Sequence, residues 1–87
     1  MNIQKIRKLQ KENGLDQLQG WIDSGLAWKL EGSVGRAAMA NLESGACMLP
    51  LNAHYDYYGS RVPGRNELKK GTKGTFQNSV AFWEENG

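Results

Sequence analysis

The fold of this chain is decided by the stretch Gly32–Gly45, which has the sequence GSVGRAAMANLESG. Ser33 is a preferred N-cap residue, because its hydroxyl can accept a hydrogen bond from an amide two or three residues later. Gly45 suits the position after a helix end, where the backbone turns left-handed. At about 100° per residue, one arc collects the apolar and small residues Val34, Gly35, Ala38, Met39 and Leu42. The stretch therefore predicts a short amphipathic helix that packs its small-residue face into a core.

Two further helices are predicted before this stretch. Asn2 can cap a helix that runs to Asn13 and ends at Gly14. The segment Leu15–Gly25 repeats the pattern and ends at its own glycine. The two apolar stripes consist of Ile3, Ile6 and Leu9 in the first helix and Leu15, Leu18, Trp21 and Ile22 in the second. We expect Trp21 and Ile22 to be buried together with Val34, Ala38 and Leu42.

The segment between the second and third helices, Leu26–Glu31, alternates apolar and polar residues. It is too short for periodicity to distinguish a strand from a helical turn. Further along, Ala46–Leu51 is apolar but contains Pro50, which favours a buried extended segment or an edge strand. Both segments are therefore left open between alternatives.

The second half of the chain has a different character. Residues 52–59 form an aromatic cluster that ends in a turn, and residues 60–75 combine glycines with basic residues, as in an ordered loop or an arm. Thr75 or Asn78 can cap a last helix over Phe76–Glu85. We therefore predict one mainly α domain over residues 1–87. It comprises a helical half (1–45), an irregular aromatic and basic segment (46–75) with room for a short strand, and a terminal helix (76–87).

Composition excludes several classes of protein. The 87 residues include one cysteine and one histidine, so no disulfide can form within the chain and a zinc site is not expected. No apolar run has the length of a signal sequence or a membrane span. The net charge of +2 is too small to indicate nucleic acid by itself. We expect a soluble cytoplasmic protein with no cofactor, no metal and no membrane partner.

The best candidates for catalysis are His54 and Asp56, which lie among three tyrosines. A His and an Asp two residues apart could form an acid–base pair in a turn, with a tyrosine as nucleophile or donor. No second catalytic group supports this interpretation, and tyrosines commonly cover a small core beside a turn. We therefore expect no enzyme activity, no catalytic residues and no small-molecule substrate.

A binding role is a stronger expectation for the segment from Tyr55 to Lys73, where aromatic and basic residues alternate among glycines. Tyr, Trp and Arg are the usual hot-spot residues of protein interfaces. The residues predicted to contact a partner protein are Tyr55, Tyr57, Tyr58, Arg61, Arg65, Lys69, Lys70 and Lys73. The alternative is a DNA- or RNA-binding regulator that uses the basic residues of 61–73 and of the first helix. Its predicted contacts are Lys5, Arg7, Lys8, Lys11, Arg36 and Lys73.

Two resemblances bear on these alternatives. Lys5–Gln17, Leu26–Leu30 and Asn41–Gly45 resemble pieces of Xre/Cro-type helix-turn-helix repressors, which implies DNA binding. The later pieces come further along the chain than in that family, and a recognition helix needs a fixed offset from its support.

Tyr57–Leu68 and Gly71–Thr75 are similar in style to short accessory proteins encoded by bacteriophages and plasmids. This second resemblance implies a regulatory or host-inhibiting binding role, including an anti-defence role, on a mobile genetic element.

Overall fold

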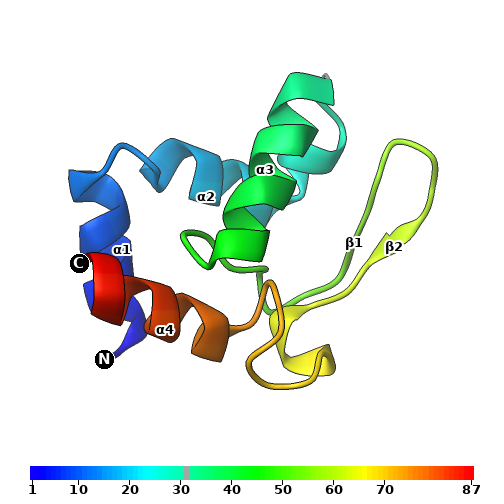
Figure 1. Cartoon of the computed structure of the whole chain (residues 1–87). Helices are drawn as coiled ribbons and strands as arrows, with labels where there is room; N and C mark the ends of the chain where they lie inside the picture. The colour runs from blue at the N-terminus through cyan, green and yellow to red at the C-terminus, as the bar shows by residue number, and fades with distance from the viewer. Residues whose placement is uncertain (31) are drawn as a thin grey trace.

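A computed structural model describes residues 1–30 and 32–87. Over these residues the elements are α1 (Ile3–Glu12), α2 (Asp16–Ser24), a 3-10 turn η1 (Leu26–Trp28), α3 (Gly32–Ser44), strands β1 (His54–Tyr55) and β2 (Arg61–Val62), a second 3-10 turn η2 (Arg65–Glu67) and α4 (Phe76–Asn86). The predicted mainly α class is confirmed, with three helices before the irregular segment and one after it. Figure 1 shows α1 against α4 at one end of the molecule, α3 near the middle and the β1–β2 hairpin at the other end.

Local capping accounts for several of the helix ends. Asn2 Oδ1 accepts a hydrogen bond from the Lys5 amide at 2.9 Å, and Thr75 Oγ1 accepts one from the Asn78 amide at 3.2 Å. Gly45 has a φ of +99°, and a side chain there would collide with the Asn78 carbonyl of α4. The predicted N-cap at Ser33 is wrong, because α3 already includes Gly32. The position before Gly32 lies outside the described residues.

The core consists of two packed clusters. One surrounds α3 and contains Ile22, Ala27, Ala38, Leu42, Cys47 and Leu49, and the other joins α1 to α4 through Ile6, Leu9, Ala46, Met48 and Trp83. Of the residues predicted to be buried, Ile22, Ala38 and Leu42 are buried, while Trp21 and Val34 are half-buried.

Met39 shares the predicted arc of α3, but 40% of its surface is exposed. The apolar arc of α3 is therefore wider than the core that covers it.

The segment Ala46–Pro50 runs through the middle of the molecule and is buried throughout. The predicted burial is confirmed there, whereas Leu51 is 59% exposed. The segment is not a strand, and its backbone groups bond partly to backbone groups of other segments and partly to two glutamine side chains. Gln19 accepts from the Met48 amide at 3.0 Å and donates to the Met48 carbonyl at 2.8 Å. Gln10 donates to the Ala46 carbonyl at 3.0 Å and to Gln19 Oε1 at 2.8 Å.

The strands occur later than the predicted edge strand, within the aromatic segment. β1 and β2 are antiparallel, with His54 opposite Val62 and Tyr55 opposite Arg61. Asp56 Oδ1 closes the turn between them by accepting from the Tyr58 and Ser60 amides at 2.9 and 2.8 Å. The other open segment, Leu26–Glu31, contains a helical turn, η1, over its first three residues.

Candidate functional site

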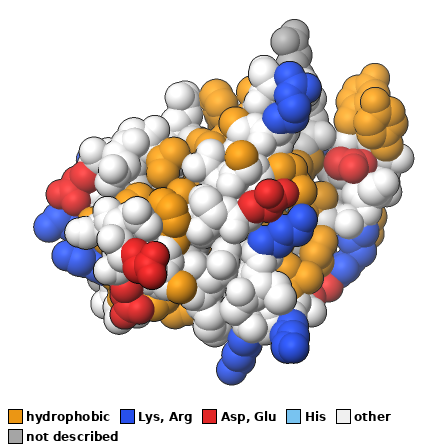
Figure 2. Space-filling view, viewed as in Figure 1, with side chains coloured by type: hydrophobic (Ala, Val, Ile, Leu, Met, Phe, Trp, Pro, Cys, Tyr) orange, Lys and Arg blue, Asp and Glu red, His pale blue; other side chains and the backbone are white. Residues whose placement is uncertain are grey.

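A groove of about 970 Å³ lies between the hairpin on one side and α3 with η1 on the other. The helix contributes Gly35 and Met39, η1 contributes Trp28, and the hairpin side contributes Val62 and Pro63. Hydrophobic side chains are visible between α3 and the hairpin in Figure 2. The groove therefore has an apolar floor that is open to solvent.

A smaller cavity of about 290 Å³ adjoins this floor, and we call it the pit. The groove and the pit share Trp28, Met39, Val62 and Pro63. The remaining apolar residues of the pit are Leu42, Leu49 and Leu68. Since its lining is almost wholly apolar, the pit suits an apolar group rather than a polar one.

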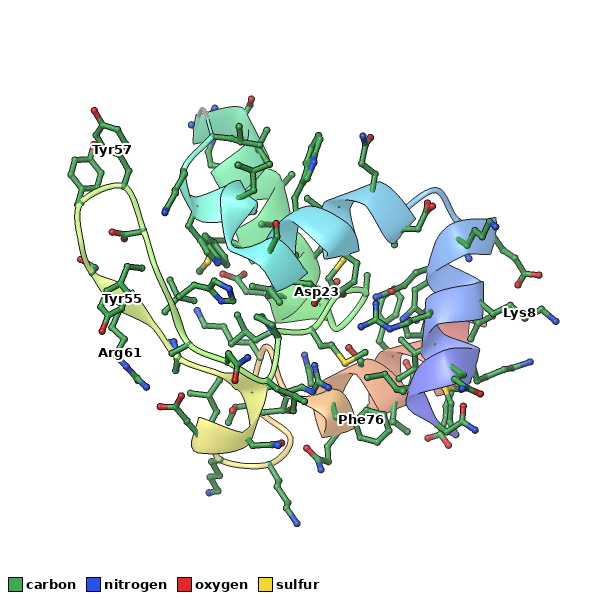
Figure 3. All side chains as sticks on the ribbon, turned by 180° about the vertical axis from the view of Figure 1, so that it is seen from behind. Lys8, Asp23, Tyr55, Tyr57, Arg61 and Phe76 are labelled. Atoms are coloured by element: carbon green, nitrogen blue, oxygen red, sulfur yellow. The ribbon has the colours of Figure 1, made fainter. Side chains whose placement is uncertain are left out.

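The hairpin tip presents two tyrosines at the mouth of the groove. Tyr57 and Tyr58 are 77% and 88% exposed, and their rings meet edge to face with centroids 5.3 Å apart. Figure 3 shows Tyr57 at the far end of the hairpin. The Tyr57 amide donates to the Trp28 carbonyl at 3.1 Å, which fixes the tip against η1. The two rings are thus displayed on a turn whose backbone is held on both sides.

Most carboxylates around the groove already have partners. Arg61 donates to both oxygens of Glu67, at 2.7 and 3.0 Å, and the Gly64 amide also donates to Glu67 at 2.9 Å. The hydrogen bonds from Arg61, followed by that from Gly64, lower the pKa of Glu67. Glu43 lies 3.9 Å from Lys73 Nζ.

Two cationic side chains on the rim of the groove differ from these carboxylates in their lack of an ion pair among the described residues. Lys29 and Arg36 line the groove and are exposed. Neither makes an ion pair within the described part of the chain. The described rim therefore offers positive charge that is not already neutralised.

The residues predicted to contact a partner protein do not form one surface. Tyr57, Tyr58 and Arg61 line the groove, and Lys73 lines the pit. Lys69 and Lys70 are exposed on the loop after η2, at the base of the hairpin and away from its tip (Figure 1). Tyr55 is 58% exposed and lies opposite Arg61 in the hairpin (Figure 3), but it does not line the groove or the pit.

Arg65, which was also predicted to contact a partner, is engaged inside the fold. Its Nη1 donates to the Leu49 carbonyl at 2.9 Å, and its amide donates to the Pro50 carbonyl at 2.9 Å. Burial lowers the pKa of Arg65. Its position shows a structural role in joining η2 to the interior segment.

The residues predicted for nucleic acid also divide between two places. Lys5, Arg7, Lys8 and Lys11 lie on α1, and Figure 3 places Lys8 at the opposite end of the molecule from Tyr57. Arg36 and Lys73 lie beside the groove and the pit. Arg7 pairs with Asp23 at 3.2 Å, so part of the α1 charge is neutralised.

The side chains considered for catalysis, His54 and Asp56, take part in the packing and hydrogen bonding of the fold. Asp56 holds the turn, and a side chain at Gly25 would collide with the ring of His54, which shows how closely that ring packs on the start of η1. Within the described residues, no hydrogen bond joins His54 to Asp56. Cys47 is fully buried, and burial, aided by the charge of Asp23, raises its pKa to about 11. Its thiol is therefore protonated and inaccessible at neutral pH.

Sequence reasoning missed the residues that form the groove floor. Trp28, Met39, Val62 and Pro63 were not among the predicted contacts, although they line both the groove and the pit. A signal was present for Met39, because the apolar arc of α3 exceeds what one neighbouring helix covers. No local pattern indicated that Val62 and Pro63 would fold back beside that arc.

Comparisons of the chain with protein-family models, with curated proteins and with solved structures found no match. Along the described residues, none of the helices combines the length and apolar character that crossing a bilayer requires. In the same residues, no three His, Cys, Asp or Glu side chains gather in a way that could hold a metal ion. The features that bear on function are accordingly the groove, the pit and the hairpin tip.

Proposed function

We propose that this chain is a non-enzymatic binding protein that recognises another protein through the groove between α3 and the hairpin. The observation that carries the proposal is the continuity of an apolar floor, a deeper apolar pit and two exposed tyrosines. Exposed apolar patches of this kind mark interaction sites in small proteins. The groove thus replaces the whole 55–73 segment as the proposed contact surface.

The residue types at the groove favour a protein partner. Trp, Tyr and Arg dominate the energetics of protein interfaces, and the groove contains Trp28, Tyr57, Tyr58 and Arg61. The tyrosines lie on a turn that is held by Asp56 and by the Trp28 carbonyl. A preorganised surface loses less conformational entropy on binding, which favours affinity.

A binding role without catalysis is supported by the use of the polar groups nearby. Asp56 is engaged in the hairpin turn, and Cys47 is buried with a raised pKa. A small protein that binds without catalysing acts by blocking its partner or recruiting it. We propose such a regulatory role, in line with the resemblance to accessory proteins of mobile genetic elements.

Site-specific photo-crosslinking in the source cell tests this function. A photoreactive phenylalanine analogue at Met39 should yield one discrete adduct with a partner protein. The same analogue at Gln4, an exposed residue of α1, is the matched control. The Tyr58→Ala substitution should reduce the Met39 adduct without lowering the melting temperature. A discrete adduct at Gln4 with none at Met39, or no adduct at either position, would refute the proposal.

Nucleic-acid binding is the second candidate, and the face of α1 favours it. Lys5, Lys8 and Lys11 are exposed there, and none is in an ion pair among the residues that the structure describes. If they contact phosphates, binding should weaken with salt, and replacing each lysine by Gln should reduce the slope by about 0.9 per contact on duplex DNA. The absence of a gel shift at low salt, on duplex and single-stranded probes alike, would exclude this candidate.

A further inference from the structure

The shape and charge of the groove indicate which kind of protein segment it accepts. We propose that the groove binds an acidic amphipathic helix of another protein, with one large apolar side chain inserted into the pit. This inference rests on the proposed function, because it specifies the chemistry of the partner at the same site. Four observations support it: the few free backbone groups of the hairpin, the volume of the groove, the apolar pit and the positive charge of the rim.

The hairpin offers little to an extended peptide. A peptide that adds to a sheet needs a row of free amide and carbonyl groups along an edge. β2 has only two residues, Arg61 and Val62, and Pro63 after it has no amide hydrogen. The other strand, β1, also has only two residues, and in the turn that follows it the amide of Tyr57 is already bonded to the Trp28 carbonyl of η1. Recognition at the groove therefore depends on side chains, which favours a helical segment over a strand.

The dimensions of the groove suit a helix. Two turns of an α-helix, with a diameter of 10–12 Å including side chains, occupy on the order of 1,000 Å³. The groove has a volume of about 970 Å³. Its two walls, α3 and the hairpin, run in similar directions in Figures 1 and 3, so a helix could lie along both.

The pit provides a place for one anchoring side chain. An apolar cavity of about 150 Å³ is large enough to hold benzene. The pit has about 290 Å³ and is bounded by Trp28, Met39 and Leu68. A Leu, Met, Phe or Trp side chain from the partner would be desolvated there, and such central anchors supply most of the binding energy of an interface.

The charge of the groove rim indicates that the partner helix is acidic. The described lining of the groove carries three cations, Lys29, Arg36 and Arg61, against two carboxylates, Glu43 and Asp56. Asp56 accepts turn amides and keeps its charge, whereas Glu43 pairs with Lys73 of the adjoining pit. Lys29 and Arg36 remain exposed on the rim, without an ion pair in the described residues. Acidic residues flanking the apolar face of the partner helix would meet these cations, and a basic helix would be repelled.

Display selection tests the inference and does not require the partner to be identified. The whole chain is used as bait against a library of helical peptides about four turns long, with the apolar and flanking positions randomised. Enriched peptides should carry apolar residues at helical spacing and a net negative charge. They should not bind Met39→Arg, which fills the groove. The double variant Lys29→Glu and Arg36→Glu should bind them about tenfold more weakly.

The matched control is Lys5→Glu with Lys8→Glu on α1, which should leave peptide affinity within about twofold. Neutral or basic winners, equal binding by Met39→Arg, or no enrichment would overturn the inference. If the Met39 adduct forms in the cell and persists at full yield with the Lys29 and Arg36 reversal, the acidic-helix inference fails while the proposed function stands. If no Met39 adduct forms, the proposed function itself fails.

Discussion

Two irregular segments of this molecule, Ala46–Pro50 and Asp56–Ser60, differ in which side chains bind their backbone groups. Each must satisfy backbone groups without regular secondary structure. In the interior segment, distant side chains supply part of the partners: Gln10 and Gln19 bind the backbone of residues 46 and 48, while the amides of Cys47 and Leu49 donate to backbone carbonyls of other segments. In the hairpin turn, the side-chain partner is local, because Asp56 accepts from the amides of Tyr58 and Ser60, while the Tyr57 amide donates to the backbone carbonyl of Trp28.

This difference separates stability from recognition. The interior segment joins α1, α2 and α4, since Trp83 of α4 also donates to the Ala46 carbonyl at 3.3 Å. The hairpin turn contributes almost no burial, with Tyr57 and Tyr58 largely exposed. Substitutions in the interior should therefore unfold the protein, whereas substitutions at the tip should affect only binding. Variants of each segment can test this separation, beginning with the largest expected effect.

Ala38→Arg should unfold the protein. Ala38 has no exposed surface and packs in the cluster around α3, so an arginine would be buried without room or a partner for its charge. We expect a loss of more than about 4 kcal/mol of stability, in the range seen for severe core disruption. The measurement is thermal denaturation followed by far-ultraviolet circular dichroism. Ala37→Arg, at the exposed neighbouring position, is the control and should melt like the parent.

Gln19→Leu should be strongly destabilising, although leucine is apolar and similar in size. The change removes both partners of Met48, leaving a buried amide and a buried carbonyl unpaired. At roughly 1–3 kcal/mol for each unpaired group, we expect a loss of about 3 kcal/mol in urea denaturation. Gln17→Leu, at an exposed position of the same helix, should change stability by less than about 0.5 kcal/mol. Equal stability of the two variants would show that the interior segment does not depend on its hydrogen bonds to Gln19.

The helices were predictable from the sequence because their signals are local. Asn2, Thr75 and Gly45 act where their residue types indicate, and the apolar stripes identify most of the core. The hydrogen bonds that Gln10 and Gln19 make to the interior segment were not predictable, because these glutamines precede their backbone partners by 36 and 29 residues. Glutamine is typical of a solvated helix face, so the sequence does not indicate that Gln10 and Gln19 are buried in the tertiary fold.

The candidate site was predictable only in part, for the same reason. Tyr57, Tyr58 and Arg61 were identified because exposed aromatic and basic residues form a visible pattern in the sequence. The groove floor needs Met39 of α3 to face Val62 and Pro63, which are distant in the chain. The N-cap at Ser33 failed because a cap-forming residue is also tolerated in the first turn of a helix.

High pH should destabilise the interior through Cys47. Burial raises the pKa of its thiol from the ordinary value of 9.0 to about 11 in the folded protein. Above the lower value the unfolded chain loses this proton while the folded protein keeps it, so the unfolded state is favoured as pH rises. The free energy of unfolding falls by up to about 1.4 kcal/mol per pH unit, and the total loss across this range is on the order of 3 kcal/mol. Below the lower value Cys47 contributes no pH dependence.

The measurement for Cys47 is urea denaturation across this alkaline range, compared with Cys47→Ala. Lysines and tyrosines titrate in both proteins, so only the difference between the two curves reports the thiol. Parallel curves would mean that the thiol is exposed to solvent, contrary to the packing around residue 47.

The smallest effect on stability is expected at the hairpin tip, where the effect on binding should be large. Tyr57→Ala and Tyr58→Ala remove side chains that are 77% and 88% exposed, and Asp56 still holds the turn through backbone amides. Each variant should therefore stay within about 0.5 kcal/mol of the parent in denaturation. If these rings are interface anchors, each change should lower partner affinity by more than 1 kcal/mol, about fivefold or greater. Asp56→Ala should weaken partner binding as well, because the turn that orients both rings loses two hydrogen bonds. Lys70→Ala, at the base of the hairpin, is the control and should change neither stability nor partner affinity. A tip that can be removed without loss of affinity would place recognition on the groove floor alone, and a tip whose removal lowers the melting temperature would show that the two irregular segments are not independent.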